Sequence, residues 1–116
     1  MAPTTLPGQK ATTAPLGRDS KYCGMPLRIS EMFAQIPRSV YIERVSVHSP
    51  KTVRQAKRAI KKAFTYQIEK RGFTMIEVLS TCPTGWGLDP VEALTWLEKN
   101  MIPYYPLGVF KLPEDA

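Results

Sequence analysis

The residues with the greatest chemical potential lie in one short loop, from Ser80 to Trp86. Cys82 could act as a nucleophile or a cluster ligand, although a single cysteine before a proline is more often a structural, partly buried residue. Trp86 could stack on a ring, or it could cap the edge of the core or pack against a neighbouring subunit. The loop follows a predicted strand, and ligands bind beyond the carboxyl ends of strands in open parallel α/β sheets. It is therefore the leading candidate for a site.

His48 is the only histidine in the chain. It ends another predicted strand, a place compatible with acid–base chemistry or a phosphate contact. The alternative is a local hydrogen-bonding residue at the start of the next helix.

The sequence contains no self-sufficient catalytic or metal-binding motif. The patterns GxGxxG, GxxxxGK[ST], HExxH and GxSxG are all absent. Cys23 and Cys82 are too few and too widely spaced for a disulfide framework or a zinc site, which favours a reducing cytoplasm. The sequence predicts no catalytic residue and no metal ligand of its own.

Positive charge is concentrated on one predicted helix. The chain carries a formal net charge of +6. Half of its basic residues lie on or beside that helix: Lys51, Arg54, Lys57, Arg58, Lys61, Lys62, Lys70 and Arg71. This helix could bind nucleic acid or another polyanion as a small basic binding module, or it could present an ordinary solvated face. No aromatic residues are interleaved with the cations as a stacking platform for bases requires.

The elements that position these residues follow from apolar spacing and from capping residues. We predict a short helix beginning near Pro26 and ending at Pro37, and a strand from Val40 to His48. A long helix follows, capped by Ser49 with Pro50 and stopped by Gly72. Its predicted apolar stripe comprises Val53, Ala56, Ile60, Ala63, Phe64 and Ile68.

A second strand from Phe73 to Ser80 and a third helix complete the predicted order. Asp89 and Pro90 begin this helix, Asn100 and Pro103 end it, and the remaining residues are predicted to be extended. Two strands joined by a long helix form a βαβ unit with a parallel pair. Two strands alone make a poor sheet, so we expect the end of a larger, doubly wound α/β domain.

Composition is that of a globular chain, with 43% hydrophobic and 22% charged residues. No stretch approaches the roughly 18 apolar residues of a membrane span, and no signal peptide is visible. Residues 1–26 are rich in proline and glycine and are predicted to be irregular, either as a tail or linker or as a loop that crosses a partner or an active site. Residues 27–116 are predicted to form the α/β portion. We expect a soluble, cytoplasmic protein.

The stretch from Gly72 to Lys111, GFTMIEVLSTCPTGWGLDPVEALTWLEKNMIPYYPLGVFK, resembles a known family. It is similar to the C-terminal part of the thiamine-diphosphate-binding (beta) subunits of 2-oxoacid:ferredoxin oxidoreductases of the 2-oxoglutarate and 2-oxoisovalerate types. Residues 41–64 fit the preceding strand and helix of that domain. Residues 1–19 fit the loop that follows the family's Thr-Gly-Gly-Gln segment.

The resemblance implies CoA-dependent oxidative decarboxylation of a 2-oxoacid on thiamine diphosphate, with electrons passed through iron–sulfur clusters to ferredoxin. The family's magnesium-diphosphate motif precedes the matched region, so thiamine diphosphate and Mg²⁺ are expected in the full enzyme and no cofactor in the isolated chain. Many relatives place a cluster cysteine near the position of Ser30 in this chain. Two cysteines cannot supply the four thiolates of a cluster.

The resemblance also implies where this chain would contact the cofactor. Thr4 and Thr5 are expected near the cofactor pocket, with Cys82, Pro83 and Thr84 as a second wall. The expected partners are the remainder of the beta subunit, alpha- and gamma-type subunits and ferredoxin, with no membrane and no nucleic acid. Self-association is expected, as is inactivity in isolation. The sequence does not identify the 2-oxoacid.

Overall fold

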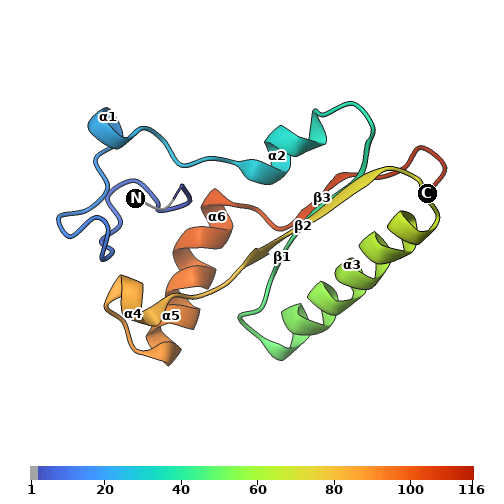
Figure 1. The fold of residues 1–116 in the computed structure, drawn as a ribbon. Coiled ribbons are helices and arrows are strands. Elements are labelled where there is room, and N and C mark those ends of the chain that lie inside the picture. Colours follow the sequence, from blue (N-terminus) through green and yellow to red (C-terminus); the bar gives the residue numbers. More distant parts are fainter. Residues whose placement is uncertain (1–2) are drawn as a thin grey trace.

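A single mixed sheet organises residues 3–116, the part of the chain that the computed structural model describes (Figure 1). Its strands are β1 (Ser39–Ser46), β2 (Phe73–Leu79) and β3 (Gly108–Lys111), in the spatial order β2-β1-β3. β1 pairs in parallel with β2 and antiparallel with β3. The predicted α/β class and parallel pair are confirmed. The sequence did not predict β3, because four residues between Pro106 and Pro113 carry too little alternation to mark a strand.

Helices cover both faces of this sheet, with α3 (Pro50–Ile68) on one face and α2 (Ile29–Ala34) on the other (Figure 1). The predicted start of α3 is confirmed. Ser49 and Thr52 form a capping box, in which each side chain bonds the other residue's backbone N–H, and Pro50 occupies the first turn.

The face that α3 buries differs from the predicted stripe. The helix packs on β1 and β2 through Ala56, Ala59, Ala63 and Tyr66. Three residues of the predicted stripe are instead exposed, by 40% at Ile60, 63% at Phe64 and 81% at Ile68. The small alanine side chains allow the helix to approach the sheet closely, so the bulky residues lie to one side of the contact.

The end of α3 is set by Lys70 and not by Gly72 alone. Lys70 adopts the left-handed conformation with φ of 55°, two residues after the last helical residue. Gly72 then has φ of 145°, and a Cβ there would lie 2.7 Å from both the Arg38 carbonyl oxygen and a methyl of Val40. Gly72 is therefore required for the close approach of the backbone at the start of β2.

The first predicted helix begins later than expected. α2 starts at Ile29, and Pro26 lies outside it. Met32 and Ile36 are exposed, whereas Ser30 is fully buried against the sheet. A polar contact therefore orients this helix, which apolar periodicity does not reveal.

The last helical region is longer than predicted. After α4 (Pro83–Trp86), α5 (Pro90–Trp96) continues through a π-helical turn, η1 (Leu97–Met101), into α6 (Ile102–Tyr104). The predicted end at Asn100 and Pro103 is wrong. A proline ring clashes with the carbonyl of the preceding turn in a regular α-helix, and the wider turn just before Pro103 relieves that clash.

Residues 3–26 fold back against this helical region. Leu6 is buried with Leu79, Leu97, Met101 and Tyr105 in one cluster. The segment also contains the short helix α1 (Ser20–Cys23). None of the helices in the described part of the chain is long and apolar enough to cross a membrane.

Candidate functional site

A pocket of about 260 Å³ lies beyond the carboxyl end of β2, between the N-terminal segment and the loop that follows the strand. Its walls are rich in hydroxyl groups. They are formed by Thr4, Thr5, Gln9, Ala11, Thr12, Thr13, Ser80, Cys82, Gly85, Trp86 and Met101. We call this hollow the carboxyl-end pocket.

The structure brings three of the five predicted site residues together. Thr4, Thr5 and Cys82 line the carboxyl-end pocket, whereas Pro83 and Thr84 are not among the described residues that line it. Pro83 and Thr84 form the start of α4, whose later residues Gly85 and Trp86 do line the pocket. Cys82 is exposed, so the expectation of a partly buried structural cysteine is wrong.

Arg18 holds the N-terminal wall of the pocket in place. Its side chain is 7% exposed, and its guanidinium donates hydrogen bonds to backbone carbonyls at two separate points of the segment. One acceptor is the carbonyl oxygen of Thr5, 2.9 Å from the guanidinium nitrogen. The other acceptors are the carbonyls of Cys23, Gly24 and Met25. Because Arg18 is buried, these carbonyls satisfy N–H groups of its guanidinium that would otherwise lose their hydration.

Trp86 closes one side of the pocket and packs on Trp96 behind it. The rings of Trp86 and Trp96 lie 4.9 Å apart with a tilted geometry, and both pack against the cluster around Leu97. Trp86 thus caps the edge of the core, one of the two roles considered for it, while its remaining surface lines the carboxyl-end pocket. Thr12 extends this contact, because its N–H donates to the carbonyl of Gly85 at 2.9 Å.

Tyr105 supports the N-terminal wall of the carboxyl-end pocket at Thr4. It is fully buried, and its hydroxyl donates to the carbonyl of Thr4 at 3.3 Å. Burial raises the pKa of Tyr105 to about 12, so the phenol is neutral and remains a donor at physiological pH.

A buried ionic network lies on the α2 face of the sheet. The Arg44 guanidinium contacts Glu31 at 2.5 Å and Glu77 at 2.7 Å, and Ser30 donates to Glu77 at 2.5 Å. The hydrogen bond from Arg44 holds the pKa of Glu31 below its usual range, despite some burial of the carboxyl. Sequence patterns did not predict this network, because its members are far apart in the chain and Arg44 occupies a position of a buried strand where an apolar residue is expected.

The other titratable candidates have local roles. Nδ1 of His48 lies 2.6 Å from Oγ of Ser46, as expected for a local hydrogen-bonding residue. Cys23 is exposed at the end of α1. Across residues 3–116, no group of three or more histidine, cysteine, aspartate or glutamate side chains is arranged to hold a metal ion.

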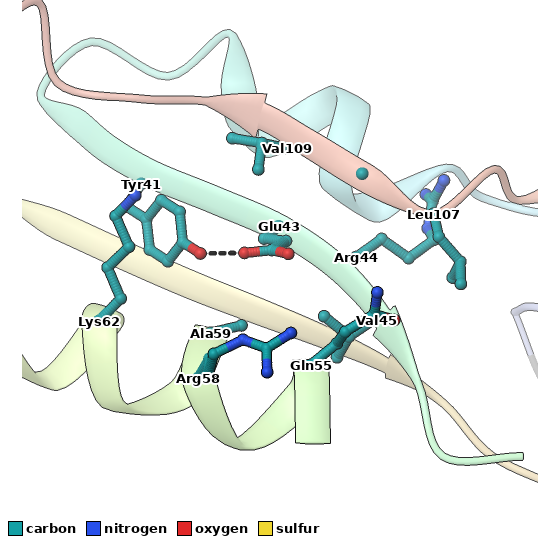
Figure 2. Close-up of a pocket in the computed structure, with 11 residues that line it drawn as sticks. Tyr41, Glu43, Arg44, Val45, Gln55, Arg58, Ala59, Lys62, Leu107 and Val109 are labelled. Carbon is teal, nitrogen blue, oxygen red and sulfur yellow. Dashed lines mark hydrogen bonds between the residues drawn. The ribbon is translucent and has the colours of Figure 1, made fainter. Parts of the chain in front are cut away.

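A second hollow, of about 450 Å³, lies between α3 and β3 (Figure 2). It is polar: Arg58 and Lys62 of α3 lie along it, with Glu43 of β1. The Tyr41 hydroxyl donates to the Glu43 carboxylate, and Lys62 lies 5.2 Å from the centre of the Tyr41 ring. Burial, together with the hydrogen bond to Glu43, raises the pKa of Tyr41. The Tyr41 hydroxyl and the Glu43 carboxylate satisfy each other, and the carboxyl-end pocket remains the better candidate site.

Comparison with known proteins identifies relatives over nearly the whole chain. The chain is 42% identical over 111 residues to ketoisovalerate oxidoreductase subunit VorA of Methanothermobacter thermautotrophicus, a match to 96% of this chain and 23% of the relative. The corresponding subunit of Methanothermobacter marburgensis gives the same values. 2-Oxoglutarate synthase subunit KorB of Methanocaldococcus jannaschii is 34% identical over 110 residues, covering 88% of this chain and 35% of the relative.

The chain therefore spans about a quarter to a third of the length of the relatives it matches. No family model matches it, and no solved structure matches it. The resemblance to subunits of 2-oxoacid oxidoreductases, expected from residues 72–111, is confirmed by these relatives.

Proposed function

We propose that this chain, a homologue of 2-oxoacid:ferredoxin oxidoreductase subunits, forms part of the thiamine-diphosphate-binding (beta) subunit of such an enzyme. The carboxyl-end pocket would be one wall of the cofactor site. The observation that carries this proposal is the meeting of Thr4 and Thr5 with Cys82 in one pocket beyond the parallel strands. Ligands of open α/β sheets bind at that edge.

The residues of this wall fit part of the cofactor and not its metal. Hydroxyl groups at Thr4, Thr5 and Ser80 can hydrogen-bond a polar or phosphorylated group, and Trp86 and Met101 offer apolar surface to a ring. Mg²⁺ is bound through carboxylates and phosphate oxygens, and no cluster of acidic side chains lines the pocket within the described chain. The metal would therefore be held by another polypeptide or by another part of the subunit.

In this proposal thiamine diphosphate supplies the carbanion chemistry when it is bound in the assembled enzyme. The residues of this chain orient the cofactor and exclude water from one side of it. Trp86, packed on Trp96, forms a rigid apolar surface for this role. The isolated chain would be inactive because it supplies one wall of the site, and iron–sulfur clusters, coenzyme A and ferredoxin would be bound by the other subunits.

The test is an anaerobic affinity purification of the chain from its native host, followed by mass spectrometry and a thiamine assay. We expect larger oxidoreductase chains and thiamine diphosphate to co-elute, and the eluate to reduce a viologen dye when a 2-oxoacid and coenzyme A are both added. Recovery of the chain alone, without thiamine, would contradict the proposal. Nucleic acid in the eluate, released steeply by added salt, would favour the basic binding module instead.

A further inference from the structure

The two flanks of α3 differ in chemistry. The flank facing β3 forms the polar hollow with Arg58, Lys62 and Glu43 (Figure 2). The flank facing β2 forms an apolar groove of about 500 Å³, lined by Ile60, Ala63, Phe64, Gln67, Thr74 and Ile76. We call this the α3–β2 groove. Charged side chains line the hollow at the β3 flank, whereas none of the described residues that line the α3–β2 groove is charged.

The α3–β2 groove adjoins an open strand edge. β2 is the outer strand of the sheet beside β1, so its other edge pairs with no strand in the described chain. Strands of parallel pairs are usually buried on both faces, whereas the residues of β2 before Leu79 are only partly buried or exposed. Val78, whose neighbour Val45 faces α3, is 42% exposed. An unpaired edge beside an apolar groove is a template for a further strand.

Three exposed apolar residues of α3 lie where they would cover such a strand. Ile60, Phe64 and Ile68 recur at four-residue intervals and therefore share one side of the helix. The residues that contact β1 and β2 are the neighbouring alanines, so this row lies beyond the sheet as it stands. A strand added beside β2 would bury the row.

Charge indicates what kind of polypeptide fits. Lys57 and Lys61 lie three residues before Ile60 and Phe64, which places them along the outer side of the apolar row. α3 contains no acidic residue between Pro50 and Ile68. A second copy of the chain, docked by the same face, would set two basic helices without acidic residues against each other. An acidic partner would pair with these lysines instead.

We propose that the α3–β2 groove is a docking surface for a β-strand of an acidic polypeptide. The strand adds to the free edge of β2, places apolar side chains under Ile60, Phe64 and Ile68, and is followed by carboxylates that face Lys57 and Lys61. Under the proposed function this occupant is a neighbouring part of the oxidoreductase subunit, and to that extent the inference rests on that function. The surface itself is independent of the cofactor.

The probe is a short, disulfide-closed β-hairpin. Its first strand alternates valine and threonine, and its second strand carries glutamates on the side that faces α3; a matched hairpin carries lysines in their place. We expect the glutamate hairpin to bind the purified chain at least about tenfold more tightly than the lysine hairpin by fluorescence anisotropy, and added salt to reduce the difference. Equal binding of the two hairpins, or binding of neither, would overturn the proposal.

Two variants locate the site. Phe64→Asp should abolish binding of the glutamate hairpin, whereas Val109→Asp, at an exposed residue of the opposite edge strand, should leave it unchanged. Circular dichroism establishes that both variants are folded. A dimer of the unmodified chain in light scattering that Phe64→Asp dissociates would show that a second copy occupies the groove, and would overturn the acidic partner. No thiamine diphosphate is used, so failure here and failure of the proposed function are distinguishable.

Discussion

Arg44 shows how much of this fold depends on one side chain. It is 1% exposed and bridges α2 to the sheet through Glu31 and Glu77. Its guanidinium also lies 5.2 Å from the Tyr105 ring and 4.9 Å from the Phe110 ring. A buried cation of this kind is tolerated because its charge and its donors are matched by partners.

Arg44→Ala should lower the free energy of unfolding by about 3 kcal/mol, because it leaves the partly buried carboxylates of Glu31 and Glu77 without a counter-charge. Urea unfolding followed by circular dichroism measures the change. Arg58→Ala, at an exposed residue of α3, is the control and should change stability by less than about 0.5 kcal/mol. A loss below about 1 kcal/mol for Arg44→Ala would mean that water screens the network.

Cys82 provides the residue-level test of the carboxyl-end pocket. Cys82→Trp should fill much of its 260 Å³ and, under the proposed function, weaken thiamine diphosphate binding by the assembled complex at least about tenfold, or about 1.4 kcal/mol. Thr84→Trp is a matched control, since Thr84 lies in the same loop but is not among the residues lining the pocket. Isothermal titration calorimetry on the complex distinguishes them. Equal effects of both substitutions would remove Cys82 from the cofactor site.

The sequence predicts three residues of the carboxyl-end pocket but neither of the two buried arginines. Thr4, Thr5 and Cys82 could be selected from the family resemblance and from their place after a strand. Arg18 and Arg44 could not, because charged residues are expected at the surface and their partners become neighbours only after the chain has folded. Their burial follows from tertiary contacts that no local pattern records.

At the scale of elements, capping residues were more informative than apolar spacing. Ser49 and Asp89 each predicted a helix start that the structure confirms. The predicted stripe on α3 is correct at Ala56 and Ala63, which contact the sheet, and wrong at its bulky members Ile60, Phe64 and Ile68, which are exposed. The π-helical turn before Pro103 is not predicted, because a proline ordinarily marks a helix end.

Two lysine-to-glycine substitutions, one at the end of α3 and one in its interior, should change the stability in opposite directions. Lys70→Gly should stabilise the chain by about 1 kcal/mol, because glycine adopts φ of 55° without the steric cost that lysine bears. Lys57→Gly removes the same charge from the interior of α3 and should destabilise by about 1 kcal/mol. The midpoints of urea unfolding should therefore move in opposite directions. A shift of both midpoints in the same direction would contradict the assigned helix end.

At the scale of the whole molecule, the Glu31 network predicts acid sensitivity. Because Arg44 lowers the folded pKa of Glu31 below its ordinary 4.5, the unfolded chain binds this proton more readily. The stabilisation is fully present above about pH 4.5 and is lost as the pH falls through the folded pKa. The difference in unfolding free energy between the unmodified chain and Glu31→Gln should therefore shrink below pH 4.5. Glu98→Gln, at an exposed position, is the control substitution and should change the unfolding free energy by less than about 0.5 kcal/mol.

The sheet as a whole could be predicted in class but not in extent. The βαβ pattern gave the parallel pair, and the argument that two strands are insufficient suggested a larger domain. The antiparallel strand β3 supplies a third strand by pairing with the edge of β1 that β2 does not occupy. The other side of the sheet, at β2, stays open in the described chain.

The hydrogen bonds of Arg18 have a consequence for cooperativity. One guanidinium joins the carbonyl of Thr5 to those of residues 23–25, so neither end of the N-terminal segment can detach without loosening the other. Such a segment opens as a single unit, and its amide protons exchange with solvent together instead of fraying from the terminus inward. The carboxyl-end pocket is then either formed in full or missing an entire wall.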